Sequence, residues 1–174
     1  MQKVLLITMG DPTGVGPEII VQAAGQGAFA GLSRPVVVAG DLAVMQRAAG
    51  TCGLTFAWQQ GSQIPLASGE LVVSGRALPL RVTSRLDLAK QQYGQPDVSS
   101  GGAMADYITW ACDRCLANEA AGMVTAPINK QALQLAGVNF PGHTELLAAV
   151  SDTHLRAHET GVEIWYAVVW VNRG

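Results

Sequence analysis

The chain has 174 residues, of which 49% are hydrophobic and 14% are charged, and its formal net charge is −2. This length suits one domain with its own core, and the charge gives no reason to expect nucleic acid or an anionic membrane as a partner. Because no apolar run approaches the ~20 residues needed to span a bilayer and no signal peptide precedes the first apolar segment, we expect a cytoplasmic protein.

The first element is predicted to be a buried parallel strand over 3–8, because Val4 to Ile7 form a continuous apolar run. The strand leads into Met9-Gly-Asp-Pro-Thr-Gly-Val-Gly-Pro-Glu18, and a helix is expected over 17–24. A glycine-rich loop between a strand and a helix can present backbone N–H groups to an anion. Its spacing matches neither G-x-G-x-x-G nor a P-loop. The alternative is a turn that serves only the geometry of the chain.

The middle of the chain predicts a second parallel strand over 34–39 and a helix over 41–49, with Asp41 as its N-cap. Short strands are expected over 70–74 and 80–82. A helix is then predicted over 99–117, because apolar residues recur there with the period of an amphipathic helix. This alternation of strands and helices indicates an α/β fold with open parallel strands.

The three cysteines form no disulfide framework. Cys112 and Cys115 make a C-x-x-C pair, a spacing that can be redox-active or provide half of a metal site. No second pair completes four ligands, and both residues fall inside the predicted helix. We therefore expect them to face the core.

Two polar clusters follow a predicted strand over 122–126. The first, Asn129-Lys130, lies at the carboxyl end of that strand, where ligands usually bind in α/β sheets. The second, His143-Thr144-Glu145, follows a short helix predicted over 131–136. Lys130 is a candidate ligand for phosphate or carboxylate, or else a solvated lysine at a helix start. His143 could donate to a phosphate or act as an acid or base, or it could cap the next helix.

The end of the chain carries a polar segment followed by a β-forming run over 162–171. On a helix, His154 and His158 would share one face, and with Glu159 they could be interpreted as a metal site. The order of these residues is not that of a zinc protease. We expect a solvated or frayed segment instead.

Three motifs in this order, M-G-D-P-T-G-V-G-P-E, T-A-P-I-N-K and P-G-H-T-E-L-L-A, resemble those of the 4-hydroxythreonine-4-phosphate dehydrogenase family. The resemblance implies an isocitrate/isopropylmalate-dehydrogenase-like α/β fold, with a mostly parallel sheet and flanking helices. It implies NAD as the oxidant, a divalent metal (Zn, Mg or Co) and a homodimer with its active site between subunits. Members oxidise the secondary alcohol of a four-carbon hydroxy-acid phosphate, and the resulting 3-keto acid then loses carbon dioxide. In pyridoxine biosynthesis this reaction supplies a precursor of pyridoxal phosphate.

Within this resemblance, the substrate-binding His-Thr pair of the family corresponds to His143 and Thr144. Lys130 and Asp11 correspond to less well-defined substrate contacts. The metal ligands of the family have no counterpart here, because they belong to a second half that follows the matching region.

The likeness covers residues up to about 149, and family members are longer. We therefore expect a family-like portion over 1–149, a divergent tail over 150–174 and an incomplete second half. Two alternatives to dehydrogenase activity follow. One is an inactive truncated remnant that still binds phosphate or dimerises, and the other is a phosphate acyltransferase of similar fold.

Overall fold

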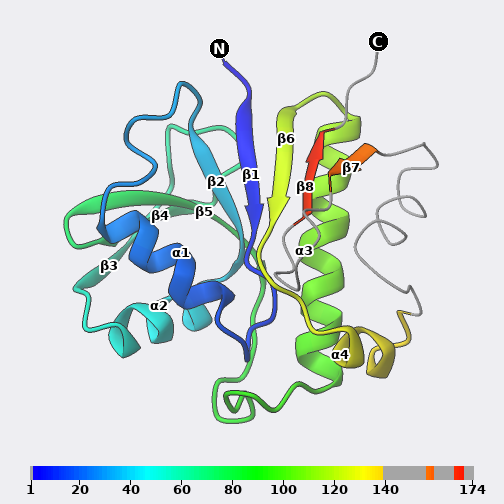
Figure 1. Ribbon diagram of the computed structural model, residues 1–174. Helices are drawn as coiled ribbons and strands as arrows, with labels where there is room; N and C mark the ends of the chain where they lie inside the picture. The colour runs from blue at the N-terminus through cyan, green and yellow to red at the C-terminus, as the bar shows by residue number, and fades with distance from the viewer. Residues whose placement is uncertain (1, 139–155, 159–166, 171–174) are drawn as a thin grey trace.

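The computed structural model describes residues 2–138, 156–158 and 167–170. Within them, one eight-stranded sheet has the strand order β3-β4-β5-β2-β1-β6-β8-β7 (Figure 1). The elements in chain order are β1 (Val4–Thr8), α1 (Gly16–Gly25), β2 (Val36–Asp41), α2 (Leu42–Thr51), β3 (Phe56–Gln60), β4 (Gly69–Val73), β5 (Arg76–Ser84), α3 (Val98–Leu116), β6 (Ala120–Thr125), α4 (Lys130–Leu135), β7 (Arg156–His158) and β8 (Ala167–Trp170).

The centre of the sheet is parallel and its two edges are antiparallel. Strands β5, β2, β1 and β6 all pair in parallel. On one side β3 and β4 extend β5 as an antiparallel meander, and on the other side β8 and β7 extend β6. The predicted α/β fold with parallel strands near the ligand loops is therefore confirmed.

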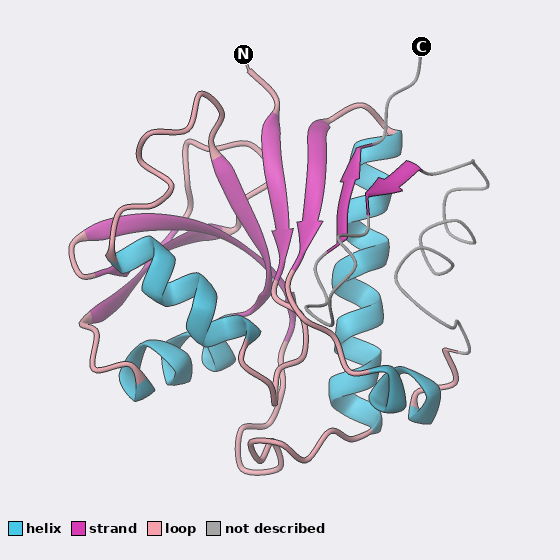
Figure 2. Ribbon diagram, in the orientation of Figure 1, coloured by secondary structure: helices cyan, strands magenta, loops and turns pink. Residues whose placement is uncertain are grey.

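Helices pack on both faces of this sheet. Successive residues of a strand point to opposite faces. Accordingly, Val37 belongs to the core that packs against α3, whereas its neighbour Val38 belongs to the core beneath α1 and α2. Figure 2 shows α1 and α2 grouped together, apart from α3 and α4. The central strands are thus covered on both sides, which explains their continuous apolar runs.

Side-chain caps fix where three of the helices begin. Asp41 accepts a hydrogen bond from the Val44 N–H at the start of α2, as the sequence predicts. Asp97 and Ser100 form a reciprocal capping box at the start of α3. Asn129 caps α4 by accepting from the Ala132 N–H at 3.1 Å. These caps satisfy backbone groups that otherwise lack partners.

Most predicted elements are confirmed, with boundaries that differ by a few residues, but two strand predictions need correction. Strand β3 was not expected, because four of its five residues are exposed and it carries no buried apolar stripe. Strand β5 extends over Arg76–Ser84 rather than 80–82. Pro79 suggested a break, but β5 pairs with β2 only from Leu80 onward, so the proline lies where that side of the strand is unpaired.

At the end of the chain, His158 lies in strand β7, so it occupies neither a helix nor a frayed segment. Strand β8 falls inside the β-forming run predicted over 162–171. His154, Glu159 and the expected boundary after residue 149 lie outside the described residues. The division into 1–149 and 150–174 therefore stays a prediction.

Candidate functional site

The candidate site lies where the strand order changes direction. From β1 the chain continues to β2 on one side, whereas β6 joins β1 on the other side only later. Ligands of open α/β sheets bind outside the carboxyl ends of the strands at such a point. The loop after β1 carries the first sequence motif, and the loop after β6 carries the second.

These two loops are joined by backbone contacts. The Asp11 N–H donates to the Pro127 carbonyl oxygen at 2.9 Å, and the Ala126 N–H donates to the Thr8 carbonyl oxygen at 3.0 Å. Gly10 has a φ of +76°, and a Cβ at this position would lie only 2.3 Å from the Pro127 oxygen. A glycine is therefore required here both for its backbone conformation and for the close approach of the second loop.

Asp11 shapes the first loop from within. The residue is only 6% exposed, and its Oδ1 accepts hydrogen bonds from the Thr13 N–H and from Thr13 Oγ1, each at 2.8 Å. The Gly14 N–H donates to the Asp11 carbonyl oxygen at 3.1 Å and closes the turn. The carboxylate thus replaces missing backbone partners in a tight turn.

Arg47 of α2 holds the first loop from outside. One guanidinium nitrogen, Nη2, donates to the Pro12 carbonyl oxygen at 2.9 Å, and Nη1 donates to the Gln91 carbonyl oxygen at 2.6 Å. The guanidinium also lies 4.4 Å from the centre of the Tyr93 ring. The planar group therefore connects the loop after β1 to the segment that precedes α3.

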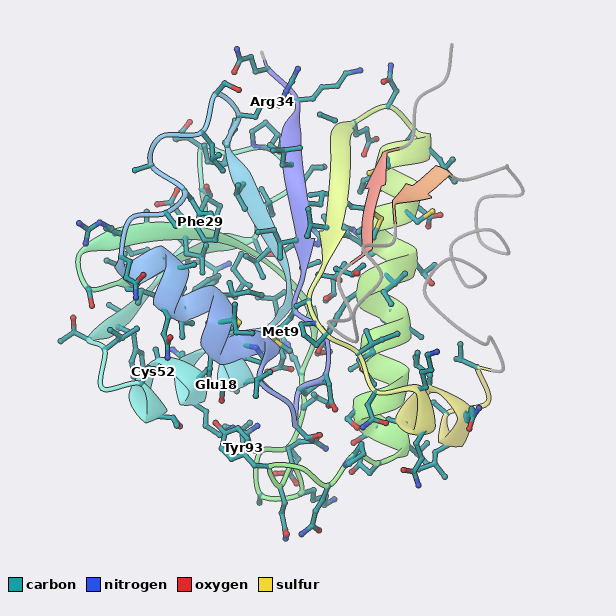
Figure 3. All side chains as sticks on the ribbon, in the orientation of Figure 1. Met9, Glu18, Phe29, Arg34, Cys52 and Tyr93 are labelled. Atoms are coloured by element: carbon teal, nitrogen blue, oxygen red, sulfur yellow. The ribbon has the colours of Figure 1, made fainter. Side chains whose placement is uncertain are left out.

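Tyr93 strengthens the same connection. Its hydroxyl lies 3.2 Å from Thr51 Oγ1 of α2, and Figure 3 shows it below Glu18 of α1. Burial raises the pKa of Tyr93, and the Glu18 carboxylate adds to that increase, so the hydroxyl stays protonated at neutral pH. The next residue, Gly94, donates its N–H to the Thr13 carbonyl oxygen at 2.9 Å.

A second polar network lies at the carboxyl ends of β2 and β5. Besides capping α2 through Oδ1, Asp41 accepts from Ser84 Oγ at 2.9 Å and from the Leu86 N–H at 2.7 Å through Oδ2. Ser84 uses its hydrogen on this carboxylate, so the Tyr107 hydroxyl, 2.7 Å away, donates to Ser84. Burial raises the pKa of Tyr107 far above its usual value. Helix α3 is thereby tied to both strands.

Lys130 is the exposed first residue of α4. Its helix is positioned by an unusually close contact with α3, because a Cβ on Gly101 would lie 2.0 Å from the Ala132 carbonyl oxygen. Lys130 thus lies at the start of the helix that follows β6, and its role as a substrate contact stays a prediction. His143 and Thr144 lie outside the described residues.

The C-x-x-C pair faces the core, as expected. Cys112 and Cys115 are both buried and free, and burial raises the pKa of Cys112 to about 11 and that of Cys115 to about 12. Such thiols are protonated at neutral pH and are poor nucleophiles and metal ligands. Within residues 2–138, 156–158 and 167–170, no three His, Cys, Asp or Glu side chains are placed to hold a metal ion.

Sequence reasoning did not identify Arg47, Tyr93, Ser84 or Tyr107. Arg47 donates to backbone carbonyl oxygens, which every residue has, so the sequence does not reveal its partners. Ser84 could have been considered if the strand predicted over 80–82 had been extended by two residues to the observed end of β5. None of the helices in the described part of the chain is both long and apolar enough to cross a membrane.

With this geometry established, comparison with known proteins identifies the family. A family model described as pyridoxal phosphate biosynthetic protein PdxA matches residues 31–166. The chain belongs to the PdxA family. This confirms the family predicted from the three motifs, and the matched range contains the second and third of them.

Curated PdxA relatives carry two names. A 4-hydroxythreonine-4-phosphate dehydrogenase from Trichlorobacter lovleyi is 44% identical over 144 residues, covering 83% of this chain and 42% of the relative. A D-threonate 4-phosphate dehydrogenase from Salmonella typhimurium is 36% identical over 162 residues, covering 88% of this chain and 45% of the relative. The chain thus spans less than half the length of these dehydrogenases.

A solved PdxA-type structure confirms the fold. The crystal structure of 4-hydroxythreonine-4-phosphate dehydrogenase from Klebsiella pneumoniae matches with a TM-score of 0.75 at 32% sequence identity. The match covers 91% of this chain and 48% of that one. This coverage agrees with the predicted family-like α/β fold and its incomplete second half.

Proposed function

We propose that this PdxA-family chain takes part in the oxidation of 4-phosphohydroxy-L-threonine, or of a related four-carbon hydroxy-acid phosphate, followed by decarboxylation, in pyridoxal phosphate biosynthesis. The observation that carries the proposal is the junction of two family motifs at the carboxyl ends of β1 and β6. The Asp11 N–H and the Pro127 carbonyl oxygen hold the motifs together at 2.9 Å. The names of the relatives support the substrate class.

Each motif has a proposed role toward the substrate. Helix α1 begins without a side-chain cap at Val15, so N–H groups of its first turn suit a phosphate or carboxylate oxygen. Lys130 adds a positive charge from the start of α4. His143 and Thr144 contact the substrate, as the family resemblance implies. Asp11 acts by holding the loop in shape, because its Oδ1 already accepts from Thr13.

NAD would accept the hydride that leaves the secondary alcohol. The described residues do not fit the divalent metal of the family, since they contain no group of three metal-binding side chains, and Asp41 is fully engaged by its own neighbours. We therefore derive no step through a metal from them. The proposed assembly is a homodimer with the site between subunits.

The direct test is NADH formation by the purified chain, followed by absorbance, with NAD, a divalent cation and either 4-phosphohydroxy-L-threonine or D-threonate 4-phosphate. Turnover of the first substrate supports the proposal, and preference for the second identifies the related activity. We expect His143→Ala and Lys130→Met to lower kcat/KM by at least about tenfold, or ~1.4 kcal/mol. Lys90→Met is the control, because Lys90 lies in an exposed pair with Asp87.

The alternative is a catalytically inactive remnant that still binds phosphate or dimerises. A folded chain that produces no NADH but binds the substrate phosphate would support it. Turnover of acetyl phosphate with coenzyme A would instead support the acyltransferase hypothesis.

A further inference from the structure

A cavity lies beside α2, apart from the Asp11 loop. It encloses about 660 Å³ at the carboxyl ends of β2 and β5, and its lining includes Gln46 of α2, Trp58 and Gln60 of β3, and Arg85 after β5. Successive residues of a helix point about 100° apart. Gln46 therefore faces this cavity while Arg47 holds the Asp11 loop. The volume falls within the usual range for small-molecule sites.

One wall of the cavity is a fixed aromatic ring. The Trp58 indole N–H donates to Gln60 Oε1 at 3.3 Å, and its inner edge packs against the core beneath α2. The ring also lies directly across Gly69, where a Cβ would meet Trp58 Cζ2 at 2.5 Å. Glycine at this position lets the indole lie flat on β4. A flat apolar surface of this kind stacks well with a planar ring.

Two polar side chains of the cavity, those of Gln46 and Arg85, have no partner in the described part of the protein. Within residues 2–138, 156–158 and 167–170, neither Gln46 nor Arg85 has a side-chain hydrogen bond or an ion pair. The carboxylate of Asp41, which also lines the cavity, is fully used by Val44, Ser84 and Leu86. The available charge is therefore the positive guanidinium of Arg85, beside amide groups that can both donate and accept.

We propose that this cavity binds a planar heteroaromatic ring that carries an anionic group, with a purine nucleotide as the matching class. The ring stacks on Trp58, the edge of the ring bonds to Gln46 and Gln60, and the phosphate pairs with Arg85. A free mononucleotide and the adenosine end of a dinucleotide share this chemistry. The inference concerns binding and does not depend on the proposed dehydrogenase reaction.

The test is isothermal titration of the purified chain with AMP, adenosine, inorganic phosphate and NAD, with Trp fluorescence as a second readout. We expect AMP to bind, adenosine to bind about tenfold more weakly because it lacks the charged contact, and phosphate alone to bind hardly at all. Arg85→Gln should weaken AMP about tenfold and leave adenosine unchanged. The matched control is Arg34→Gln, because Arg34 lies at the opposite end of the sheet (Figure 3).

Trp58→Leu should weaken AMP and adenosine alike by about tenfold, the usual effect of losing one stacked ring. Because Trp58 also packs on the core, Gln46→Leu provides a second variant with less risk to folding. A folded wild-type chain that binds none of the nucleotides would overturn the proposal, as would AMP binding that is unchanged in both Arg85→Gln and Gln46→Leu. If these variants weaken binding, tighter NAD than AMP identifies a dinucleotide site, and the reverse identifies a mononucleotide site.

Discussion

Two adjacent glycines in α3 should respond in opposite directions to the same substitution. A Cβ on Gly102 meets no atom within 4 Å, whereas a Cβ on Gly101 would lie 2.0 Å from the Ala132 carbonyl oxygen and 3.0 Å from Ala136 Cβ. Both positions lie in the interior of the helix. Alanine is favoured over glycine there by about 1 kcal/mol, so any difference between the two variants reports the contact with α4.

For Gly102→Ala we expect the free energy of unfolding to rise by about 1 kcal/mol. Gly101→Ala gains the same helix propensity, but ordinary contacts begin at 3.4 Å, so α4 would have to move outward by more than about 1 Å. Overpacking of this kind costs about 1–3 kcal/mol or more. Because the gain in helix propensity is common to both variants, they should differ by the overpacking cost alone, about 1–3 kcal/mol or more, with Gly101→Ala the less stable.

The assay is urea unfolding of both variants and the parent, followed by circular dichroism. Because α4 begins at Lys130, hydrogen exchange over 130–138 should also be faster in Gly101→Ala and unchanged in Gly102→Ala. Equal stabilisation of the two variants would refute the close packing of α4 on α3, and with it the argument that this contact positions Lys130.

Gly10→Ala should be more destabilising than Gly94→Ala by at least about 1 kcal/mol in the same unfolding assay, because both glycines have a positive φ but only Gly10 faces a neighbouring atom, the Pro127 oxygen. Equal losses would mean that backbone strain alone requires the glycine. Asp41→Ala should lower the free energy of unfolding by about 4 kcal/mol, because it removes a helix cap worth about 1 kcal/mol and two further hydrogen bonds to a charged group. A loss below about 1 kcal/mol would contradict this network. In the native chain at neutral pH, a thiol reagent should modify Cys52 well before the two α3 thiols, whose high pKa values keep them protonated. Fast modification of all three thiols without unfolding would be inconsistent with that burial. The pKa of Asp97 is lowered, because hydrogen bonds from Ser100 and its neighbours outweigh the opposing effect of burial. The Asp97 carboxylate therefore stabilises the fold above the unfolded-state pKa, and this stabilisation is lost as pH falls through the folded-state value. Asp97→Asn should accordingly lose less stability in acid than the parent does.

Several features could be predicted from the sequence because they depend on neighbouring residues. The apolar run of β2 identified a buried parallel strand, and the aspartate that ends it identified the start of α2. The glycine-rich segment after β1 and the Asn129-Lys130 cluster after β6 were both assigned to the carboxyl ends of strands, as the structure has them. By contrast, β3 has a mostly exposed pattern and becomes a strand only because β4 is available to pair with it.

The sequence by itself determined the family, the α/β class and the loops that carry the motifs, because strand patterns, caps and turn residues act over a few positions. Only the tertiary structure decided that the Asp11 N–H donates to the Pro127 carbonyl oxygen and that Arg47 donates to the Pro12 carbonyl oxygen. It also decided that Asp41, besides capping α2, accepts hydrogen bonds from Ser84 and Leu86. These contacts join residues far apart in the chain. They follow from the order in which the strands pair, and the hydrogen bonds made by backbone groups leave no mark on residue type.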